Sequence, residues 1–367
     1  MATVGAMPRW AFGRASATLA IVLAAAAATS GTGAAVPSTG AAPARSASAG
    51  PRSIVQLGDS IASGEGTSYG YKYVHGTWTG GNVNVKWDPP YDGCHDSKYA
   101  YVHTVARQFH PRPSVAQFAC TGATFDNGIS APEVSDGTTL RPAEFGNWDT
   151  QQDLNPAYDA AKPDLVLITL GADDVQFVHI VESCIENGYG YALDLVNLAC
   201  TQANPGPTIE QDFVSFAPTL REHYATLVRW IEARARAHRV PAPKIVFTTY
   251  ANPLPPNGGP AGCADVSQLY RQQVQYLSSL VGQLNQLITS TVQGLNDPHV
   301  AVADISRAYT PGRSNHRWCT SDPWSYGLSI YSVLSPSSFE SQAPFHPTPR
   351  GQASIAGLVV PTVERLF

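Results

Sequence analysis

Five short apolar runs are separated by longer segments in which apolar residues return every three or four positions. Each short run has the length of a β-strand and is rich in Val, Ile and Leu, residues that pack well in sheets. The predicted strands cover residues 53–58, 115–120, 164–170, 244–250 and 299–305. The third run is apolar almost throughout, which is typical of a central parallel strand covered on both faces.

The segments between the predicted strands have helical periodicity. We expect helices over residues 97–109, 208–238 and 265–293, the last being the longest, and a final helix from about residue 351. Thr-Ile-Glu-Gln at 208–211 is a capping-box pattern, and Pro218 is expected to kink or restart the helix that follows. This alternation predicts the α/β class, as a three-layer α/β/α sandwich around a central, mostly parallel sheet.

The N-terminal residues differ in composition from the rest. Arg9 and Arg14 precede an uninterrupted apolar run over residues 19–28 and then small residues, which is the layout of a secretory signal. A retained membrane anchor is the alternative, but this run is shorter than the ~20 residues that span a bilayer. We predict a signal peptide, a flexible linker and a single domain with disulfide-tied loop insertions, over residues 1–35, 36–52 and 53–367.

The charge balance is mildly negative. The chain carries 23 Lys and Arg against 28 Asp and Glu, for a formal charge of −5 at pH 7. Loss of the predicted signal peptide makes the balance more negative, which argues against nucleic acid as a partner. No later stretch is apolar enough to span a bilayer, so no stable membrane insertion is expected.

All the cysteines lie in the predicted domain: Cys94, Cys120, Cys184, Cys200, Cys263 and Cys319. An even number behind a secretory signal predicts disulfides, although sequence alone does not choose between the pairings. We favour sequential pairing, 94 with 120, 184 with 200 and 263 with 319, because each bridge then ties down one loop-rich insertion. The chain has no Cys-x-x-Cys pair and no His-Glu-x-x-His helix, so we expect no metal and no other cofactor.

The turns after the first three predicted strands carry the candidate chemistry. Gly58 permits an abrupt change of direction, and Ser60 follows at the tip of the turn. Gly122 and Asp173 lie in the turns after the second and third strands. The carboxyl ends of parallel strands meet at one edge of the sheet. We therefore expect these residues to lie close together, with Ser60 as the nucleophile. An ordinary polar turn is the alternative reading of Gly-Asp-Ser taken alone.

A histidine has to reach the same edge if Ser60 is to be activated, because a neutral serine is a poor nucleophile. The chain has 10 histidines. His346 stands in Ala-Pro-Phe-His-Pro-Thr-Pro at 343–349, directly before the last predicted helix. Prolines stiffen this loop, so a fixed backbone can hold the side chain over the sheet edge. His346 is therefore the candidate general base.

Four blocks of the sequence, in this order, resemble the SGNH (GDSL) hydrolase family. They are Gly58-Asp59-Ser60, the Gly122 turn, the Gly-x-x-Asp turn at 171–174 and Phe345-His346-Pro347. Secreted actinobacterial GDSL lipases and esterases are similar also in the six cysteines and in Cys-His-Asp-Ser-Lys-Tyr-Ala-Tyr at 94–101. The resemblance runs from about residue 53 to the end, and it implies a flavodoxin-like form of the sandwich.

The resemblance implies a role for each block. Ser60 attacks an ester carbonyl, and His346 takes its proton and returns it to the leaving alcohol, before water hydrolyses the acyl-enzyme. The backbone N–H groups of Ser60 and Gly122 and a side-chain amide form the oxyanion hole. Asp173 stands where the family has the amide of asparagine, and a carboxyl group donates a hydrogen bond only when protonated. We expect a somewhat reduced rate and an activity shifted toward acidic pH.

The family's histidine-orienting acid is also missing. Its usual place, three residues before the histidine, is occupied by Ala343. We favour a Ser-His catalytic dyad in which the backbone carbonyl of Ala343 holds the imidazole. Glu340 and Asp322 in the preceding loop are the possible substitutes.

These features predict a secreted, monomeric serine ester hydrolase that cleaves lipid or small acyl esters without a cofactor. A carbohydrate O-acetylesterase of the same fold is an alternative enzyme. Asp173 and Ala343 leave a third interpretation open, in which a weakened hydrolase serves as an extracellular binding protein. The natural ester and the acyl-chain preference do not follow from the fold.

Overall fold

Successive side chains in the strands of the central sheet point to opposite faces, and both faces are apolar. In β1 (Ser53–Gly58), Ile54 packs in one apolar cluster, whereas Val55 and Leu57 pack in the other. Successive side chains of a strand point to opposite faces, so a strand that is apolar throughout needs cover on both sides. The next strand in the sheet, β7 (Leu165–Thr169), follows the same pattern, and all its residues are buried.

The computed structural model describes most of the predicted domain, over residues 50–67, 72–74, 77–79, 92–135, 138–177, 180–181, 209–257, 271–327 and 345–367. The predicted signal peptide and nearly all of the predicted linker lie outside these ranges. So do Cys184, Cys200, Cys263, Glu340 and Ala343.

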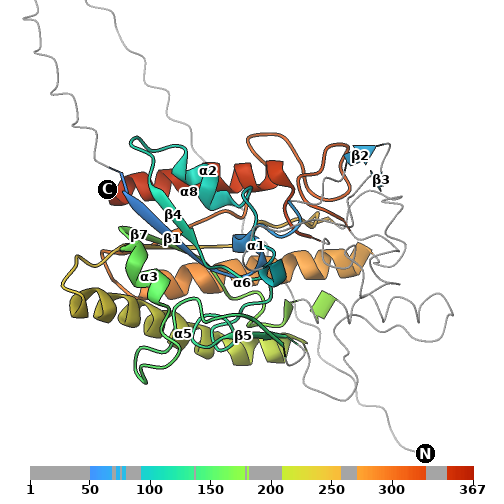
Figure 1. Cartoon of the computed structure of the whole chain (residues 1–367). Helices are drawn as coiled ribbons and strands as arrows, with labels where there is room; N and C mark the ends of the chain where they lie inside the picture. Colours follow the sequence, from blue (N-terminus) through green and yellow to red (C-terminus); the bar gives the residue numbers. More distant parts are fainter. Residues whose placement is uncertain are drawn as a thin grey trace, which may run out of the picture. The chain divides into compact units, whose positions relative to one another are not determined.

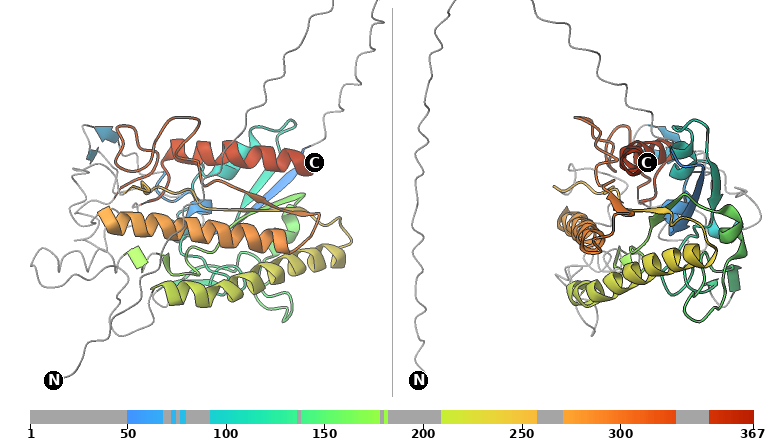
Figure 2. Two further views of the ribbon diagram at one scale, coloured as in Figure 1. Left: turned by 180° about the vertical axis from the view of Figure 1, so that it is seen from behind. Right: turned by 90° about the vertical axis from the view of Figure 1, so that its left-hand side faces the viewer.

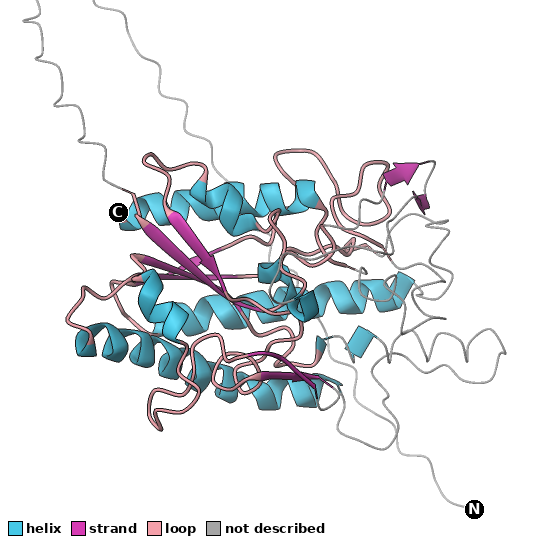
Figure 3. Ribbon diagram, viewed as in Figure 1, coloured by secondary structure: helices cyan, strands magenta, loops and turns pink. Residues whose placement is uncertain are grey.

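The main sheet is wholly parallel. Its strand order is β4-β1-β7-β8-β9, with β4 (Ser114–Gln117) at one edge and β9 (Val300–Ala303) at the other. β7 is the central strand and pairs with β1 and β8 (Lys244–Thr248). The strands are magenta in Figure 3. This is the flavodoxin-like order, in which the chain starts inside the sheet, adds one edge and then returns to the other side.

Helices cover both faces of the sheet (Figure 1). Residues of α5 (Ile209–Ala237) and α6 (Arg271–Gly294) share an apolar cluster with one face, together with Tyr158 of α3 (Pro156–Ala161). Residues of α2 (Tyr101–Ala106) and α8 (Pro349–Leu366) share a second cluster with the other face. Figure 2 shows the sheet between these two helical layers. The predicted three-layer sandwich is therefore confirmed.

The prediction that the helix restarts at Pro218 is wrong. α5 runs through Pro218 as a single element of 29 residues, and the described part of α6 has 24. Proline removes one backbone hydrogen bond, but apolar residues of α5 beyond it, including Leu220 and Tyr224, pack on the sheet and hold the helix. The predicted start of α6, at 265–270, lies outside the described residues.

Several short elements were not predicted from the pattern. They are α1 (Ser60–Ser63), η1 (Asp92–Cys94), α3 and the hairpins β2 (Lys72–Val74) with β3 (Thr77–Thr79) and β5 (Glu133–Ser135) with β6 (Thr138–Arg141). Elements of three to six residues are too short to display a period. Of the helices in the described residues, none combines the length and apolar character that a membrane crossing needs.

Candidate active site

The turn after β1 brings Ser60 to the carboxyl end of the sheet. Gly58 has a φ of 126°, and a Cβ at this position would lie 1.8 Å from the Thr169 carbonyl oxygen, so only glycine fits. Asp59 caps helix α1, because its carboxylate accepts a hydrogen bond of 3.0 Å from the backbone N–H of Ile61. Ser60 is the first residue of that helix and remains partly accessible.

His346 reaches Ser60 from the loop before α8. Its Nε2 lies 2.8 Å from Ser60 Oγ. Two backbone hydrogen bonds hold the loop, from Tyr326 N–H to the His346 carbonyl at 2.9 Å and from Phe345 N–H to the Tyr326 carbonyl at 3.0 Å. A Cβ at Gly66 would lie only 3.2 Å from His346 Cβ, so glycine here lets the histidine come close. The structure thus brings together the predicted nucleophile and the predicted base.

The turn after β4 offers a second backbone donor. Gly122 has a φ of 81°, which favours glycine. The turn is fixed by the Cys94–Cys120 disulfide and by a hydrogen bond of 2.8 Å from Cys120 N–H to the Gly58 carbonyl. Among the described residues, the N–H groups of Ser60 and Gly122 donate to no protein acceptor. Both are therefore available to an oxyanion.

Carboxyl groups with raised pKa values lie at the same edge of the sheet. Burial raises the pKa of Asp173 to about 7, and the negative charge of Asp174 adds to this. Burial, with a smaller contribution from Asp173, raises the pKa of Glu133 to about 8. Glu133 Oε1 lies 3.7 Å from a Cβ placed on Gly122, so this acid is next to the second turn. The edge therefore holds protons at pH values where exposed carboxyl groups are ionised.

Asp59 belongs to the same group of acids. It is buried, and burial followed by the charge of Asp173 raises its pKa well above the ordinary range. The Tyr250 hydroxyl donates a hydrogen bond to its carboxylate and accepts one of 3.0 Å from the backbone N–H of Ala172. Tyr250 thereby ties the turn that carries Ser60 to the turn that carries Asp173.

The sequence of the chain decides the family. A model of the GDSL-like lipase/acylhydrolase family matches residues 57–353, which is most of the chain. The chain belongs to this family. Its members hydrolyse acyl esters, so this GDSL protein is a carboxylic ester hydrolase. No relative was found among curated protein sequences.

Two solved structures support the fold. An extracellular lipase from Streptomyces rimosus is 18% identical, with a TM-score of 0.53, over 86% of this chain and 99% of that one. Phospholipase A1 from Streptomyces albidoflavus NA297 is also 18% identical, with a TM-score of 0.52, over 87% of this chain and 100% of that one. At this level of identity, the likeness establishes that the GDSL protein shares their fold.

Only some of the residues that could orient His346 lie within the described ranges. Ala343 and Glu340 lie outside the described residues. Asp322, the other candidate acid, has its carboxylate 3.0 Å from an Arg350 nitrogen and 3.3 Å from His316 Nδ1. These contacts account for Asp322 as a surface ion-pair partner.

Sequence reasoning missed two residues that position the site. Tyr250 stands at the end of the predicted fourth strand, so the rule that identified Ser60 would have placed it at the same edge. Gln352 is fully buried in the first turn of α8. Its side chain accepts from the Tyr101 N–H at 2.9 Å and donates to the Ile61 carbonyl at 3.0 Å. A polar residue among the apolar positions of the last helix was the available signal.

Outside this site, one described group of side chains has the composition of a cation site. Ligand atoms of Glu232, Asp297 and His299 lie within 4.8 Å of one another. Asp297 and His299 precede β9, so this group lies at the amino ends of the strands, opposite Ser60. Of the predicted disulfides, Cys94–Cys120 is present, and Cys319 is disulfide-bonded to a partner beyond the described residues.

Proposed function

We propose that this GDSL protein is a secreted serine esterase that cleaves lipid or small acyl esters through an acyl-enzyme intermediate. The observation that carries the proposal is the hydrogen bond of 2.8 Å between Ser60 Oγ and His346 Nε2. A nucleophile needs a base within this distance, because the hydroxyl must lose its proton as it attacks. The site has the required pair, at the edge where parallel sheets bind ligands.

Each step uses a group already in place. Ser60 Oγ attacks the ester carbonyl while His346 Nε2 takes its proton, and the resulting imidazolium protonates the leaving alcohol. The N–H groups of Ser60 and Gly122 stabilise the tetrahedral oxyanion, since both lack a described protein acceptor. Water then attacks the acyl-enzyme, with His346 as base, and releases the acid.

Asp173 serves as the third oxyanion donor when it is protonated. Its raised pKa, about 7, keeps a proton on the carboxyl group through the mildly acidic range. His346 has to be neutral to act as base, so the mechanism needs a protonated Asp173 together with a neutral His346. The rate should fall at higher pH, because ionised Asp173 loses its donor and repels the oxyanion.

We propose a Ser-His dyad in which the carbonyl of Ala343 orients the imidazole. The engagement of Asp322 with Arg350 and His316 supports this choice over an acid at position 322. The fixed backbone around His346 also reduces the need for an acid, because Tyr326 already holds the loop.

Secretion and domain organisation are part of the proposal. We assign residues 1–35 to a signal peptide, 36–52 to a linker and 53–367 to one monomeric domain. The Cys94–Cys120 disulfide supports an oxidising destination. One of the two similar structures is an extracellular lipase, and the other is a phospholipase A1, which supports a lipid ester as substrate.

A series of p-nitrophenyl esters of increasing chain length tests the proposal on wild type, Ser60→Ala and Ser63→Ala. Ser63 is the matched control, because it lies in the same short helix and donates to the Ser60 carbonyl at 3.1 Å. We expect kcat to fall roughly 10⁴-fold or more in Ser60→Ala and only slightly in Ser63→Ala.

Labelling with an organophosphonate ester provides the second arm, because only an activated serine reacts. Wild type should lose activity with one label per chain, and Ser60→Ala should take none. Folded wild type that neither reacts nor turns over any ester would contradict the proposal and favour a binding protein. Turnover confined to acetyl groups on glycans would instead select a carbohydrate esterase.

A further inference from the structure

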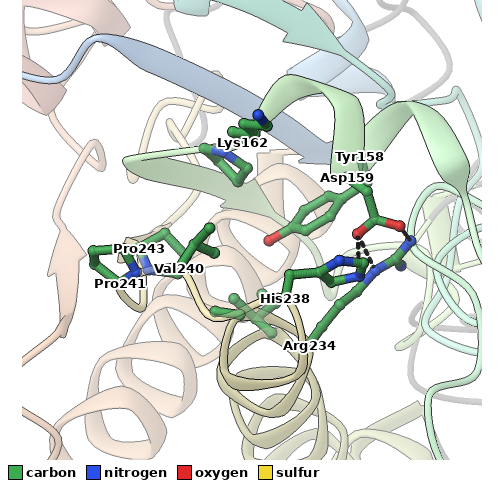
Figure 4. Close-up of a pocket in the computed structure, with 11 residues that line it drawn as sticks. Tyr158, Asp159, Lys162, Arg234, His238, Val240, Pro241 and Pro243 are labelled. Carbon is green, nitrogen blue, oxygen red and sulfur yellow. Dashed lines mark hydrogen bonds and ion pairs between the residues drawn. The ribbon is translucent and has the colours of Figure 1, made fainter.

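A cavity of about 190 Å³ lies between α3, the end of α5 and the segments before β7 and β8. Figure 4 shows its lining side chains. Because residues that precede parallel strands lie at the amino edge of a sheet, this cavity is on the opposite edge from Ser60. It therefore does not belong to the ester-hydrolysing site.

One polar group on the wall of the cavity lacks a partner. Tyr158 is 4% exposed, and its buried hydroxyl makes no hydrogen bond with the described residues. In Figure 4 the hydroxyl points away from Asp159, toward the side of the cavity lined by Val240. A buried hydroxyl without a partner is unfavourable, so an acceptor that reached it from the cavity would stabilise the complex.

Of the charged side chains around the cavity, the Lys162 ammonium is the one without a counter-charge in the described part of the chain. Arg234 forms two hydrogen bonds of 2.7 Å with the Asp159 carboxylate, and His238 Nε2 lies 3.3 Å from the same group. Asp159 is thus neutralised. Lys162, on the rim, is exposed and has no ion-pair partner in the described part of the chain. The cavity is therefore complementary to a single negative charge.

The remaining walls are apolar. Ile231, Ala235 and Val240 line one part, and Pro163, Pro241 and Pro243 line another. Pockets that enclose drug-sized ligands measure about 300–1,000 Å³, so this smaller space suits a short apolar group. A phosphate dianion would leave charge uncompensated against such walls. A monoanion with an apolar tail fits both features.

We propose that this cavity binds a small carboxylate with a short aliphatic or aromatic tail. The carboxylate accepts from the Tyr158 hydroxyl and pairs with the Lys162 ammonium, while the tail lies against Val240 and the prolines. Carboxylic acids are also what an ester hydrolase releases, which makes a short fatty acid a suitable probe.

Isothermal titration calorimetry of the folded protein with sodium hexanoate at pH 7 tests the site. We expect saturable binding with a Kd of about 1 mM or tighter. Lys162→Gln and Tyr158→Phe should each weaken it about tenfold, because each removes an interaction with a charged group. Lys98→Gln, which removes another exposed lysine, is the control and should bind hexanoate like wild type.

Hexanol and inorganic phosphate separate the two parts of the ligand. Both should bind at least about tenfold more weakly than hexanoate. Equal binding of hexanol would show a merely apolar cavity, and equal binding of phosphate would show a site for inorganic anions. Either result overturns the proposal, as does wild-type affinity in folded Lys162→Gln and Tyr158→Phe. Ser60→Ala should bind hexanoate unchanged, which keeps this test independent of the proposed catalytic mechanism.

Discussion

The amino and carboxyl edges of the sheet differ in how their charged side chains are paired. At the amino edge, Arg234 is 1% exposed and bonds to the Asp159 carboxylate and to the carbonyls of Phe145 and Asn155. Its guanidinium also lies over aromatic rings, 4.8 Å from the Phe145 centroid and 5.0 Å from that of Tyr158. The Arg234 charge therefore has a carboxylate, two carbonyls and aromatic rings as partners.

At the carboxyl edge, buried and partly buried acids raise one another's pKa values. The pKa values of Asp59, Asp173 and Glu133 are all raised by burial first and by a neighbouring acid second. His223 Nδ1 lies 3.5 Å from Asp174 Oδ1, and Arg141, the strand partner of Glu133, is paired with Asp96. The amino edge is thus arranged for stability, whereas the carboxyl edge keeps protons at the site of the chemistry and becomes less stable when they leave.

The amino edge should be the more sensitive to loss of one charge. Arg234→Met keeps an unbranched apolar side chain but removes the guanidinium that donates to Asp159 and to the carbonyls of Phe145 and Asn155. We expect the free energy of unfolding to fall by about 3–5 kcal/mol. Urea unfolding followed by circular dichroism measures this, while kcat per folded molecule should stay near wild type.

Arg229→Met is the matched control for that change. Arg229 lies on the same helix and also pairs with an aspartate, Asp149, at 2.8 Å, but both side chains are about half exposed. Solvent screens such pairs, so stability should hardly change. Equal stability of Arg234→Met and Arg229→Met would show that the buried ion pair contributes no more than the exposed one.

At the carboxyl edge, removing a charge should help rather than harm. Asp173 has a folded-state pKa of about 7, above the ordinary value, so it lowers stability as pH rises from about 4 to about 7. Asp173→Asn should match wild type near pH 4 and be more stable above pH 8, by at most about 4 kcal/mol. Denaturant unfolding at both pH values measures the difference.

The same substitution should change the rate profile. At pH 8.5 a carboxyl group with a pKa of about 7 is only roughly 3% protonated, whereas an amide always donates. We expect kcat of Asp173→Asn at that pH to exceed wild type about tenfold or more and to approach it near pH 6. Identical profiles for the two enzymes would remove Asp173 from the oxyanion hole.

The sequence pattern revealed most of the layered fold, because strands buried on both faces leave apolar runs such as 164–170, and packed helices leave an apolar stripe. It placed Ser60, Gly122 and Asp173 at one edge, because parallel strands dictate that placement. The convergence of acids such as Glu133 on that edge could not be predicted. Glu133 lies in a short hairpin whose position depends on tertiary packing, and no local period announces it.

The smallest effect on activity is expected from Glu133→Gln. Its pKa of about 8 in the folded protein lies above the ordinary range for a glutamate, so wild type loses stability as pH rises from about 4.5 to about 8. Glutamine keeps an oxygen to accept from Asn127 Nδ2, which now donates to Glu133 Oε1 at 3.1 Å. We expect Glu133→Gln to be more stable than wild type at pH 9, by a few kcal/mol at most, and equally stable at pH 4.

Glu222→Gln, at an exposed position on α5, is the control and should follow the wild-type curve at every pH. The pH profile of kcat should also change little in Glu133→Gln, because Asp174 rather than Glu133 is the acid that raises the pKa of Asp173. A gain in stability without a change in the rate profile would show that Glu133 only destabilises this edge, whereas Asp173 acts on the oxyanion. A shifted rate profile would instead mean that the carboxyl edge titrates as one coupled unit.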